Sequence, residues 1–279
     1  MDGVILPLLI APAKPCRRIP GALIVARLRI ALAAAVVGLP LLGMDDPSPP
    51  PPPMVTDRPA VAASSVVVPP GFLQVENGFA DTVNQGQHTF DGPETNLRFG
   101  IASKTELRLA APNYWGGEET SSGFGDMSVG LKRQLGPAPG GFDVSLIVSL
   151  SFPTGAHAIS SHGYDPAVQL PWSRSLSKNW TAAGMMSVYW PTQESRRNTT
   201  GEATFLLDRQ FPRSWDAFVE YAGSFPEEGK PRHLFHFGAA YRLAPNQQVD
   251  IHAGVGLSAA AVDHYVGIGY SFRLPTSAR

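Results

Sequence analysis

Histidines and serines gather in one short stretch of the chain, AHAISSHGYD at residues 156–165. The residues of interest are His157, Ser160, Ser161 and His162. Such residue types can carry nucleophilic hydrolysis when a histidine activates a serine and a polar group orients the histidine. The stretch lacks the Gly-x-Ser-x-Gly pattern of many hydrolases, and strand pairing brings no obvious acid beside it. The sequence therefore predicts an adaptable polar loop and no catalytic residue, with a barrel lipid hydrolase as the less favoured alternative.

Metal binding is the second chemistry that this stretch could offer, through His157 and His162 with Asp165. Their spacing matches no recognised zinc or non-haem iron pattern. The one cysteine, Cys16, lies far upstream, so the rest of the chain has no thiolate ligand and no disulfide. We expect neither a metal nor another cofactor.

A third kind of chemistry comes from charged residues at alternate positions of apolar segments. In VDIHAGVGL, residues 249–257, Asp250 and His252 fall between apolar residues and share one face, where both could contact one solute. The residues predicted to line an interior in this way are Glu76, Arg98, Glu106, Arg108, Asp126, Lys132, Asp143, Asp216, Glu220, Arg242, Asp250 and His252.

Both signs of charge occur in this set, so the residues could pair across a narrow interior or line a weakly selective pore. An unpaired buried charge is strongly unfavourable, which favours pairing. The clearest candidates for pairs on neighbouring strands are Arg98 and Arg108 with Glu106 and Asp126.

The elements that position these residues show a period of two. DVSLIVSLSF at residues 143–152 places apolar residues on one face and serines with Asp143 on the other. FGDMSVGLKRQL at 124–135 and LFHFGAAYRL at 234–243 repeat the pattern, and turn signals lie between such runs. About twelve segments of roughly 9 to 11 residues result, the length that crosses a bilayer when a strand is tilted.

The apolar faces are predicted to contact lipid. Glycine, serine and alanine dominate the polar faces, lysine is scarce on the strands, and aromatic residues such as Trp115, Trp180 and Trp215 gather near strand ends, where they could form interfacial girdles. A closed ladder satisfies every backbone N–H and C=O in hydrocarbon. The fold class predicted is all-β: an up-and-down antiparallel transmembrane β-barrel of about twelve strands with short periplasmic turns and longer surface loops, the first of them Asp81 to Gly92.

Composition agrees with a barrel and excludes other classes. Charged residues are 16% of the 279 residues, hydrophobic residues are 43%, and the formal net charge is −1. No overall positive field exists to attract nucleic acid, so no nucleic-acid partner is expected.

The domain organisation predicted has four parts. Residues 1–44 are a signal peptide region, in which Arg27 and Arg29 precede the apolar run 30–42. Residues 45–71 are a Pro-rich linker and N-terminal segment, 72–274 the transmembrane barrel and 275–279 a C-terminal tail. The apolar run Ser65 to Pro69 suggests that the segment before Phe72 enters and plugs the barrel.

Several stretches resemble a family of bacterial outer-membrane proteins assigned to the meta-pathway of phenol degradation, often called transporters. The likeness covers most of residues 56–274, and its stretches are TDRPAVAASSVVVPPGFLQVENGF (56–79), ETNLRFGIASKTELRL (94–109), GFGDMSVGLK (123–132), SFPTG (151–155), FVEYAG (218–223) and DHYVGIGYSFRL (263–274). Their order and spacing carry the resemblance. One departure is at the end, where RLPTSAR follows Phe272 in place of a final aromatic residue.

This resemblance implies a porin-like channel in the outer membrane of a Gram-negative envelope, for passive uptake of small hydrophobic or aromatic solutes. The partners expected are outer-membrane lipid, the solute and the outer-membrane assembly machinery. The alternative is a structural or lipid-interacting barrel with a closed lumen.

Overall fold

The computed structural model describes residues 52–117 and 121–276. The predicted signal peptide region, the start of the linker and most of the predicted C-terminal tail lie outside these residues. In the part that is described, no helix is long and apolar enough to cross a membrane.

Regular structure in the described residues consists of β-strands. They are β1 (Phe72–Asn84), β2 (Gln87–Gly92), β3 (Asn96–Ala102), β4 (Thr105–Ala110), β5 (Tyr114–Gly117), β6 (Gly123–Phe124), β7 (Met127–Ala138), β8 (Phe142–Phe152), β9 (Asp165–Ser175), β10 (Trp180–Tyr189), β11 (Thr192–Gln193), β12 (Arg196–Arg197), β13 (Thr200–Phe211), β14 (Trp215–Pro226), β15 (Arg232–Ala244), β16 (Gln247–Gly256) and β17 (His264–Pro275).

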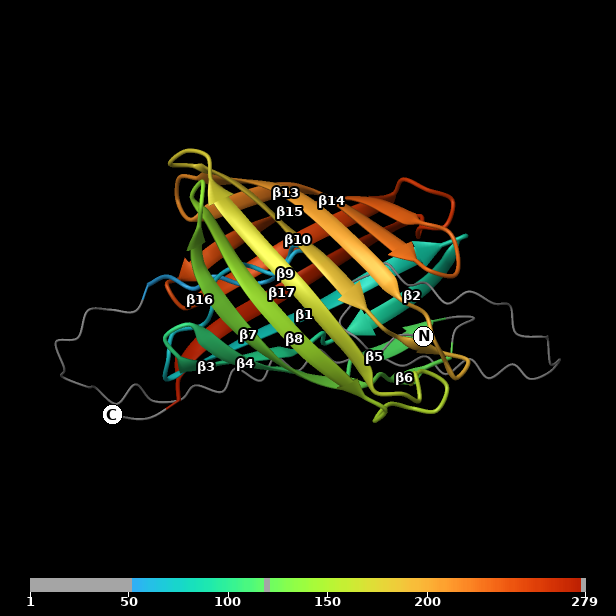
Figure 1. The fold of residues 1–279 in the computed structure, drawn as a ribbon. Helices are drawn as coiled ribbons and strands as arrows, with labels where there is room; N and C mark the ends of the chain where they lie inside the picture. Colours follow the sequence, from blue (N-terminus) through green and yellow to red (C-terminus); the bar gives the residue numbers. More distant parts are fainter. Residues whose placement is uncertain (1–51, 118–120, 277–279) are drawn as a thin grey trace, which may run out of the picture. The chain divides into compact units, whose positions relative to one another are not determined.

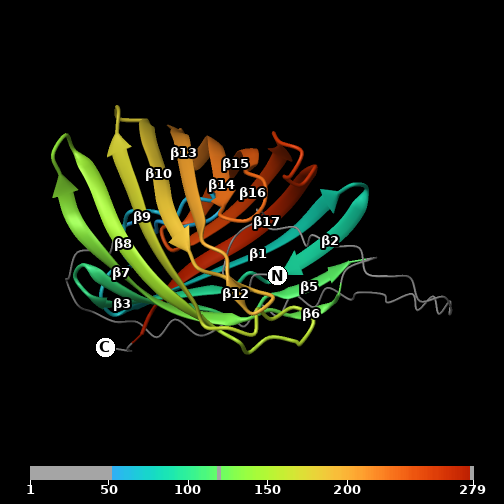
Figure 2. The same ribbon diagram turned by 45° about the vertical axis from the view of Figure 1, so that its right-hand side comes forward.

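Fifteen of these strands form one antiparallel sheet that closes on itself, because β1 pairs with β17 from Phe72 opposite Pro275 to Val83 opposite His264. Three wall positions are each shared by two short strands: β2 with β3, β4 with β5, and β6 with β7. Fifteen strands therefore fill twelve positions, and the predicted twelve-stranded barrel is confirmed (Figures 1 and 2). Closure leaves no sheet edge, so the backbone of the wall is hydrogen-bonded without water.

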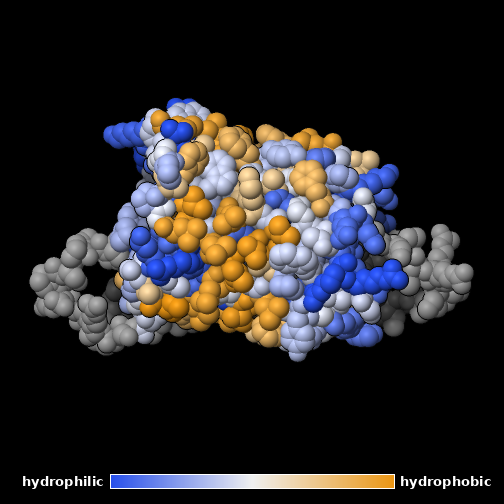
Figure 3. All heavy atoms as spheres, in the orientation of Figure 1, coloured by the Kyte–Doolittle hydropathy of each residue, from blue (hydrophilic) through white to orange (hydrophobic). Residues whose placement is uncertain are grey.

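The outer face of the wall is apolar. On β10, exposed and buried side chains alternate: Met186 and Val188 are exposed, and Met185, Ser187 and Tyr189 are buried. Met186 is 64% exposed, an unfavourable state for a large apolar side chain in water but a favourable one in hydrocarbon. Figure 3 shows apolar side chains gathered over the middle of one face, with hydrophilic ones toward both ends. Together with the closed barrel, this surface makes the protein an outer-membrane β-barrel.

Two connections differ from the sequence predictions. The predicted surface loop Asp81 to Gly92 is wrong, because β1 and β2 form a hairpin across a two-residue turn. Gln85 and Gly86 in this turn have φ values of 52° and 76°, as a tight hairpin turn of this kind requires. The predicted C-terminal tail also begins later, because Pro275 still belongs to β17.

Candidate functional site: the lumen and its N-terminal segment

Residues 54–68, here called the lumen segment, run through the inside of the barrel before β1 begins. They form no strand, yet Met54, Val61 and Val68 are buried. A segment without a ladder must satisfy its backbone N–H and C=O groups by other means. Side chains from the inner face of the wall supply these partners.

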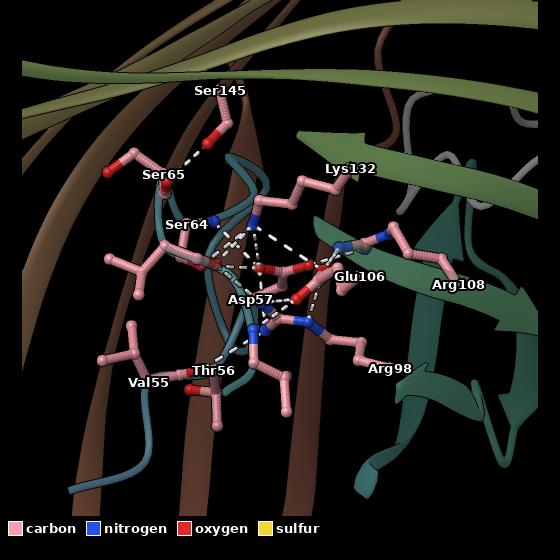
Figure 4. Close-up of polar contacts among 12 residues, drawn as sticks. Val55, Thr56, Asp57, Ser64, Ser65, Arg98, Glu106, Arg108, Lys132 and Ser145 are labelled. Atoms are coloured by element: carbon pink, nitrogen blue, oxygen red, sulfur yellow. Dashed lines mark hydrogen bonds and ion pairs between the residues drawn. The ribbon is translucent and has the colours of Figure 1, made fainter. Parts of the chain in front are cut away.

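Asp57 lies at the centre of the largest charged cluster, beneath three neighbouring strands (Figure 4). Its carboxylate is 2.6 Å from Arg108 Nη2, 3.1 Å from Arg98 Nη1 and 3.6 Å from Lys132 Nζ. Burial alone would raise the pKa of Asp57. The positive charges of Arg108, Arg98 and Lys132 outweigh burial and hold that pKa well below its ordinary value. The segment therefore contributes an anion that offsets three cations of the wall.

Glu106 and Glu76 complete this cluster. Glu106 accepts hydrogen bonds from Arg98 Nε at 2.9 Å and Arg108 Nη1 at 2.8 Å. Glu76 accepts one from Arg98 Nη1 at 2.8 Å. Three carboxylates, including that of Asp57, thus face three cations in a buried space, where only paired charges are tolerated.

The same wall residues also bind the backbone of the lumen segment. The Val68 N–H donates to Glu106 at 2.7 Å, while Lys132 Nζ and Arg98 Nη2 donate to the Val66 carbonyl at 2.8 and 2.9 Å. Glu106, Lys132 and Arg98 are therefore each used twice, in an ion pair and in holding the segment's main chain.

Arg58 makes a second anchor, directed toward the place where β1 pairs with β17. It pairs with Glu94, lies 3.4 Å from Asp250 and donates to the Ile268 carbonyl at 3.2 Å. Gly78 and Gly269 face each other across β1 and β17, and a side chain at either would collide with the guanidinium. Burial lowers the pKa of Arg58, but the charges of Glu94 and Asp250 outweigh it and raise that pKa above its ordinary value.

A third anchor is formed on β14. The Glu220 carboxylate accepts hydrogen bonds from the backbone N–H groups of Val61 and Ala62, each at 2.8 Å. His236 Nδ1 lies 2.9 Å from Glu220, and its Nε2 lies 3.1 Å from His252 Nδ1. A wall carboxylate here replaces the acceptors that a strand neighbour would offer.

A cavity of about 160 Å³ remains beside the lumen segment. Apolar side chains contribute much of its lining, among them Val61 of the segment, Trp115, Ile147 and Met185. Its volume is close to that of a cavity of roughly 150 Å³ that holds benzene in another protein. The lumen therefore has room for a solute of one aromatic ring while the segment is in place.

Residues 56–274 match the protein family described as "Putative MetA-pathway of phenol degradation". The chain belongs to this family. The match covers the lumen segment from Thr56 as well as the wall, so the family includes both parts of the site.

Solved structures of outer-membrane proteins have the same fold. The COG4313 outer membrane channel from Pseudomonas putida F1 has a TM-score of 0.60 at 10% identity, over 75% of this chain and 98% of that chain. The NanC porin has a TM-score of 0.53 at 14% identity, over 72% and 100%. A comparison with curated proteins finds no match. At these identities the likeness establishes the fold alone.

The structure places the predicted interior residues in two groups. Those that are buried are Glu76, Arg98, Glu106, Asp126, Lys132, Glu220, Asp250 and His252. Those that are partly exposed are Arg108, Asp143, Asp216 and Arg242. Arg242 and Asp216 pair at 3.5 Å, away from the lumen segment. The pair predicted between neighbouring strands joins Arg98 of β3 to Glu106 of β4, whereas Arg108 pairs with Glu106 within β4 itself.

The predicted arginine partner for Asp126 is wrong. Its carboxylate instead accepts hydrogen bonds from Gly155 N–H at 2.8 Å, Ser160 Oγ at 3.1 Å and Ser161 N–H at 3.0 Å. An acid thus lies beside the two serines, which the sequence did not predict. His162 Nε2 contacts the carbonyl oxygen of His157 at 3.0 Å, so this ring does not link acid to serine as catalytic hydrolysis requires. Asp126 anchors a loop.

The sequence interpretation missed Asp57, Arg58 and Glu94. The first two lie in the N-terminal segment that the sequence predicts to enter the barrel, but they are absent from the predicted interior charges. The family-like stretch begins at Thr56 and places both charges in an otherwise apolar run. That placement was the available signal, because a solvated linker has no reason to surround charged residues with apolar ones. Glu94 lies between β2 and β3, where alternation does not apply.

Proposed function

We propose that the protein is an outer-membrane channel for passive uptake of small hydrophobic or aromatic solutes, and that the lumen segment closes it. The observation that carries the proposal is the cavity, which is of single-ring size, is lined largely by apolar atoms, and is bounded on one side by the segment. Family membership and the fold of the similar structures support a channel.

The mechanism follows from how the segment is held. Its contacts are mainly ion pairs and hydrogen bonds, which exchange for contacts with water at a net cost on the order of 0.5–1.5 kcal/mol for a neutral hydrogen bond and 1.5–3 kcal/mol for one to a charged group. Withdrawal of the segment removes Asp57 from a cluster of three wall cations and leaves Glu106 and Glu76 to offset them. The lumen is then wider, and Trp115, Ile147 and Met185 of the wall remain as apolar contacts for the solute.

Deletion of residues 55–68 tests closure by the segment. The expected result is single-channel conductance that the full-length protein lacks or shows only in brief openings. Heat-modifiable gel migration controls for folding, because a barrel retained after deletion migrates differently before and after boiling. Unchanged conductance in a folded deletion variant would reject the segment as the closing element.

Uptake of a labelled monoaromatic solute by cells that contain or lack the protein tests the solute class. Met185→Trp fills the cavity and should lower this uptake, whereas Met186→Trp on the outer face of the same strand is the matched control. Equal uptake by cells with and without the protein would reject the proposal.

The second candidate function is a structural or lipid-interacting barrel with a permanently closed lumen. The observation that favours it is the pairing of every cation in the Asp57 cluster. A deletion variant that is folded and still does not conduct would support it. Lipid and the assembly machinery remain the proposed partners under either function.

A further inference from the structure

Three neighbouring strand positions of the wall are interrupted at the same level. The ladder stops at residues 93–95 between β2 and β3, at 111–113 between β4 and β5, and at 125–126 between β6 and β7. Pairing is regular on both sides, since Asn96 lies opposite Ala110 below the interruption and Gly92 lies opposite Tyr114 above it. These three stretches are called the seam.

The seam is weakly bonded for a barrel wall. Glu76 of β1 pairs with Asn96, and Ala80 pairs with Asp91. Three residues lie between the two pairs on β1 and four on the facing chain, so the facing chain has one extra residue, which is a β-bulge. Pro93 and Pro112 have no N–H to donate. The backbone bonds across it are Gly78 N–H to Pro93 O at 2.7 Å, Ala111 N–H to Thr95 O at 2.9 Å and Gly125 N–H to Asn113 O at 2.7 Å.

The seam separates the cavity from the hydrocarbon. Glu94, Ala111, Asn113, Gly125 and Asp126 of the seam line the cavity from inside. Just above the seam, the exposed rings of Phe79, Phe90, Tyr114 and Phe124 mark the outer surface as lipid-facing. Phe79 also lies against Gly92, where a Cβ would collide with its ring. The bulge, the three backbone bonds and two side-chain bonds, Thr95 Oγ1 to Asn77 Oδ1 and Asn113 Nδ2 to Asp91 Oδ2, each at 2.8 Å, thus divide the cavity from the membrane here.

The lumen segment is tied to this seam. Glu94 has a φ of 45°, which is uncommon for a residue with a side chain, and its carboxylate pairs with Arg58. Asn113 Oδ1 accepts the Glu94 backbone N–H at 2.9 Å, so one residue connects the segment to two of the three interrupted positions. Movement of the segment would therefore release Glu94 and loosen the seam.

We propose that an apolar solute leaves the cavity sideways through the seam into the hydrocarbon of the membrane, and that the Arg58 pair with Glu94 keeps the seam closed while the segment is in place. This inference rests on the proposed function. Both exits pass charged groups, since Arg58, Glu94 and Arg108 line the cavity itself. The sideways exit ends in hydrocarbon, where an apolar solute is more stable than in water, whereas an axial exit ends in water.

A disulfide across the seam tests the route. Thr95 and Ala111 continue the register of Asn96 with Ala110, so their Cα atoms are spaced as a disulfide requires. The double variant Thr95→Cys with Ala111→Cys should lose monoaromatic uptake when oxidised and regain it on reduction. Ala217→Cys with Ala239→Cys, a regular pair of β14 and β15, is the control and should be insensitive to oxidation.

The outcomes separate the two proposals. Uptake by the oxidised seam variant equal to that of its reduced form overturns the sideways route. Loss of ion conductance together with uptake on oxidation also overturns it, because the bond would then be closing an axial path. Failure of the unmodified protein to raise uptake at all would instead reject the proposed function.

Glu94→Gln tests the latch, since it removes the ion pair and keeps the side-chain size. It should raise uptake above that of the unmodified protein, and this increase should vanish when the same chain carries the oxidised seam disulfide. Asp81→Asn, which removes an exposed pair with His88, is the matched control. Unchanged or lowered uptake in Glu94→Gln would overturn the latch.

Discussion

The wall formed by β3, β4 and β7 binds the lumen segment through four ionised side chains, those of Arg98, Glu106, Arg108 and Lys132. The wall formed by β10 and β13 makes no hydrogen bond or ion pair to the segment among the described residues. Its inner face carries Met185, Ser187, Glu202 and Thr204, and Met185 lines the cavity. The first wall therefore holds the closing element together with the Arg58 and Glu220 anchors, whereas the second makes no polar contact with it within the described part of the chain and contributes Met185 to the cavity.

This division explains how a narrow barrel can hold both a segment and a cavity. Ionised groups need partners inside a barrel, and the segment supplies them along β3, β4 and β7. Along β10 and β13 it makes no such contact among the residues that the structure describes, and Met185 faces the cavity instead.

The largest effect is expected for Arg98→Ala in the charged wall. It leaves Glu76, Glu106 and Asp57 short of a cation in a buried site and should destabilise the folded barrel by about 3–5 kcal/mol. Urea unfolding in lipid vesicles measures this loss. Arg174→Ala, an exposed arginine over the Phe142 ring, is the control and should cost about 0.5–1 kcal/mol. Similar losses in the two variants would remove the distinction between charged cluster and surface.

Asp57→Asn should act on closure more than on folding. It weakens the hydrogen bond with Arg108, worth about 1.5–3 kcal/mol as a charged hydrogen bond, and the attraction to Arg98 and Lys132. The ratio of open to closed channels should rise roughly ten- to hundredfold in single-channel recordings, by 1.4 kcal/mol per factor of ten. Asp81→Asn is the matched control and should leave the open probability unchanged, because the Asp81 carboxylate is half exposed. An unchanged open probability in Asp57→Asn would show that the charged wall does not hold the segment.

Acid should open the channel through the same residue. The pKa of Asp57 in the closed state lies well below its ordinary value of 3.8, so its contribution is fully present above about pH 4 and is lost as pH falls through the lowered value. Closure should therefore be constant from neutral pH down to about pH 4 and weaken only in stronger acid. Recordings of Asp57→Asn in parallel should lack the Asp57 component. Opening of the unmodified channel between pH 5 and 7 would assign closure to another group.

Much of this division could be predicted from the sequence, and the rest depends on long-range contacts. Alternation along residues 143–152 and 249–257 identified inner and outer faces, because strand geometry fixes which side each residue occupies. Alternation could not show that Asp57 contacts Arg98, Arg108 and Lys132, some forty to seventy-five positions later. The local sequence pattern does not indicate which segment fills the lumen. The aligned interruptions were equally hidden, although Pro93 and Pro112 hinted at them, because their common level depends on register between strands.

The smallest effect is expected for Ser187→Ala in the wall of β10 and β13. Ser187 is buried on β10, and its hydroxyl has no hydrogen-bond partner among the described residues, so its removal leaves no group unsatisfied. The free energy of unfolding and the open probability should both stay within about 0.5 kcal/mol of the unmodified protein. An effect on closure as large as that of Asp57→Asn would mean that both walls hold the segment.

The central claim is that the lumen segment closes the channel by binding the wall. Ser65 Oγ in the segment lies 2.7 Å from Ser173 Oγ on β9, so Ser65→Cys with Ser173→Cys can tether the segment in place. The measurement is single-channel conductance of this pair in the Asp57→Asn protein, before and after reduction. Silence when oxidised and conductance when reduced is the result predicted, whereas equal conductance in both states would contradict closure by the segment.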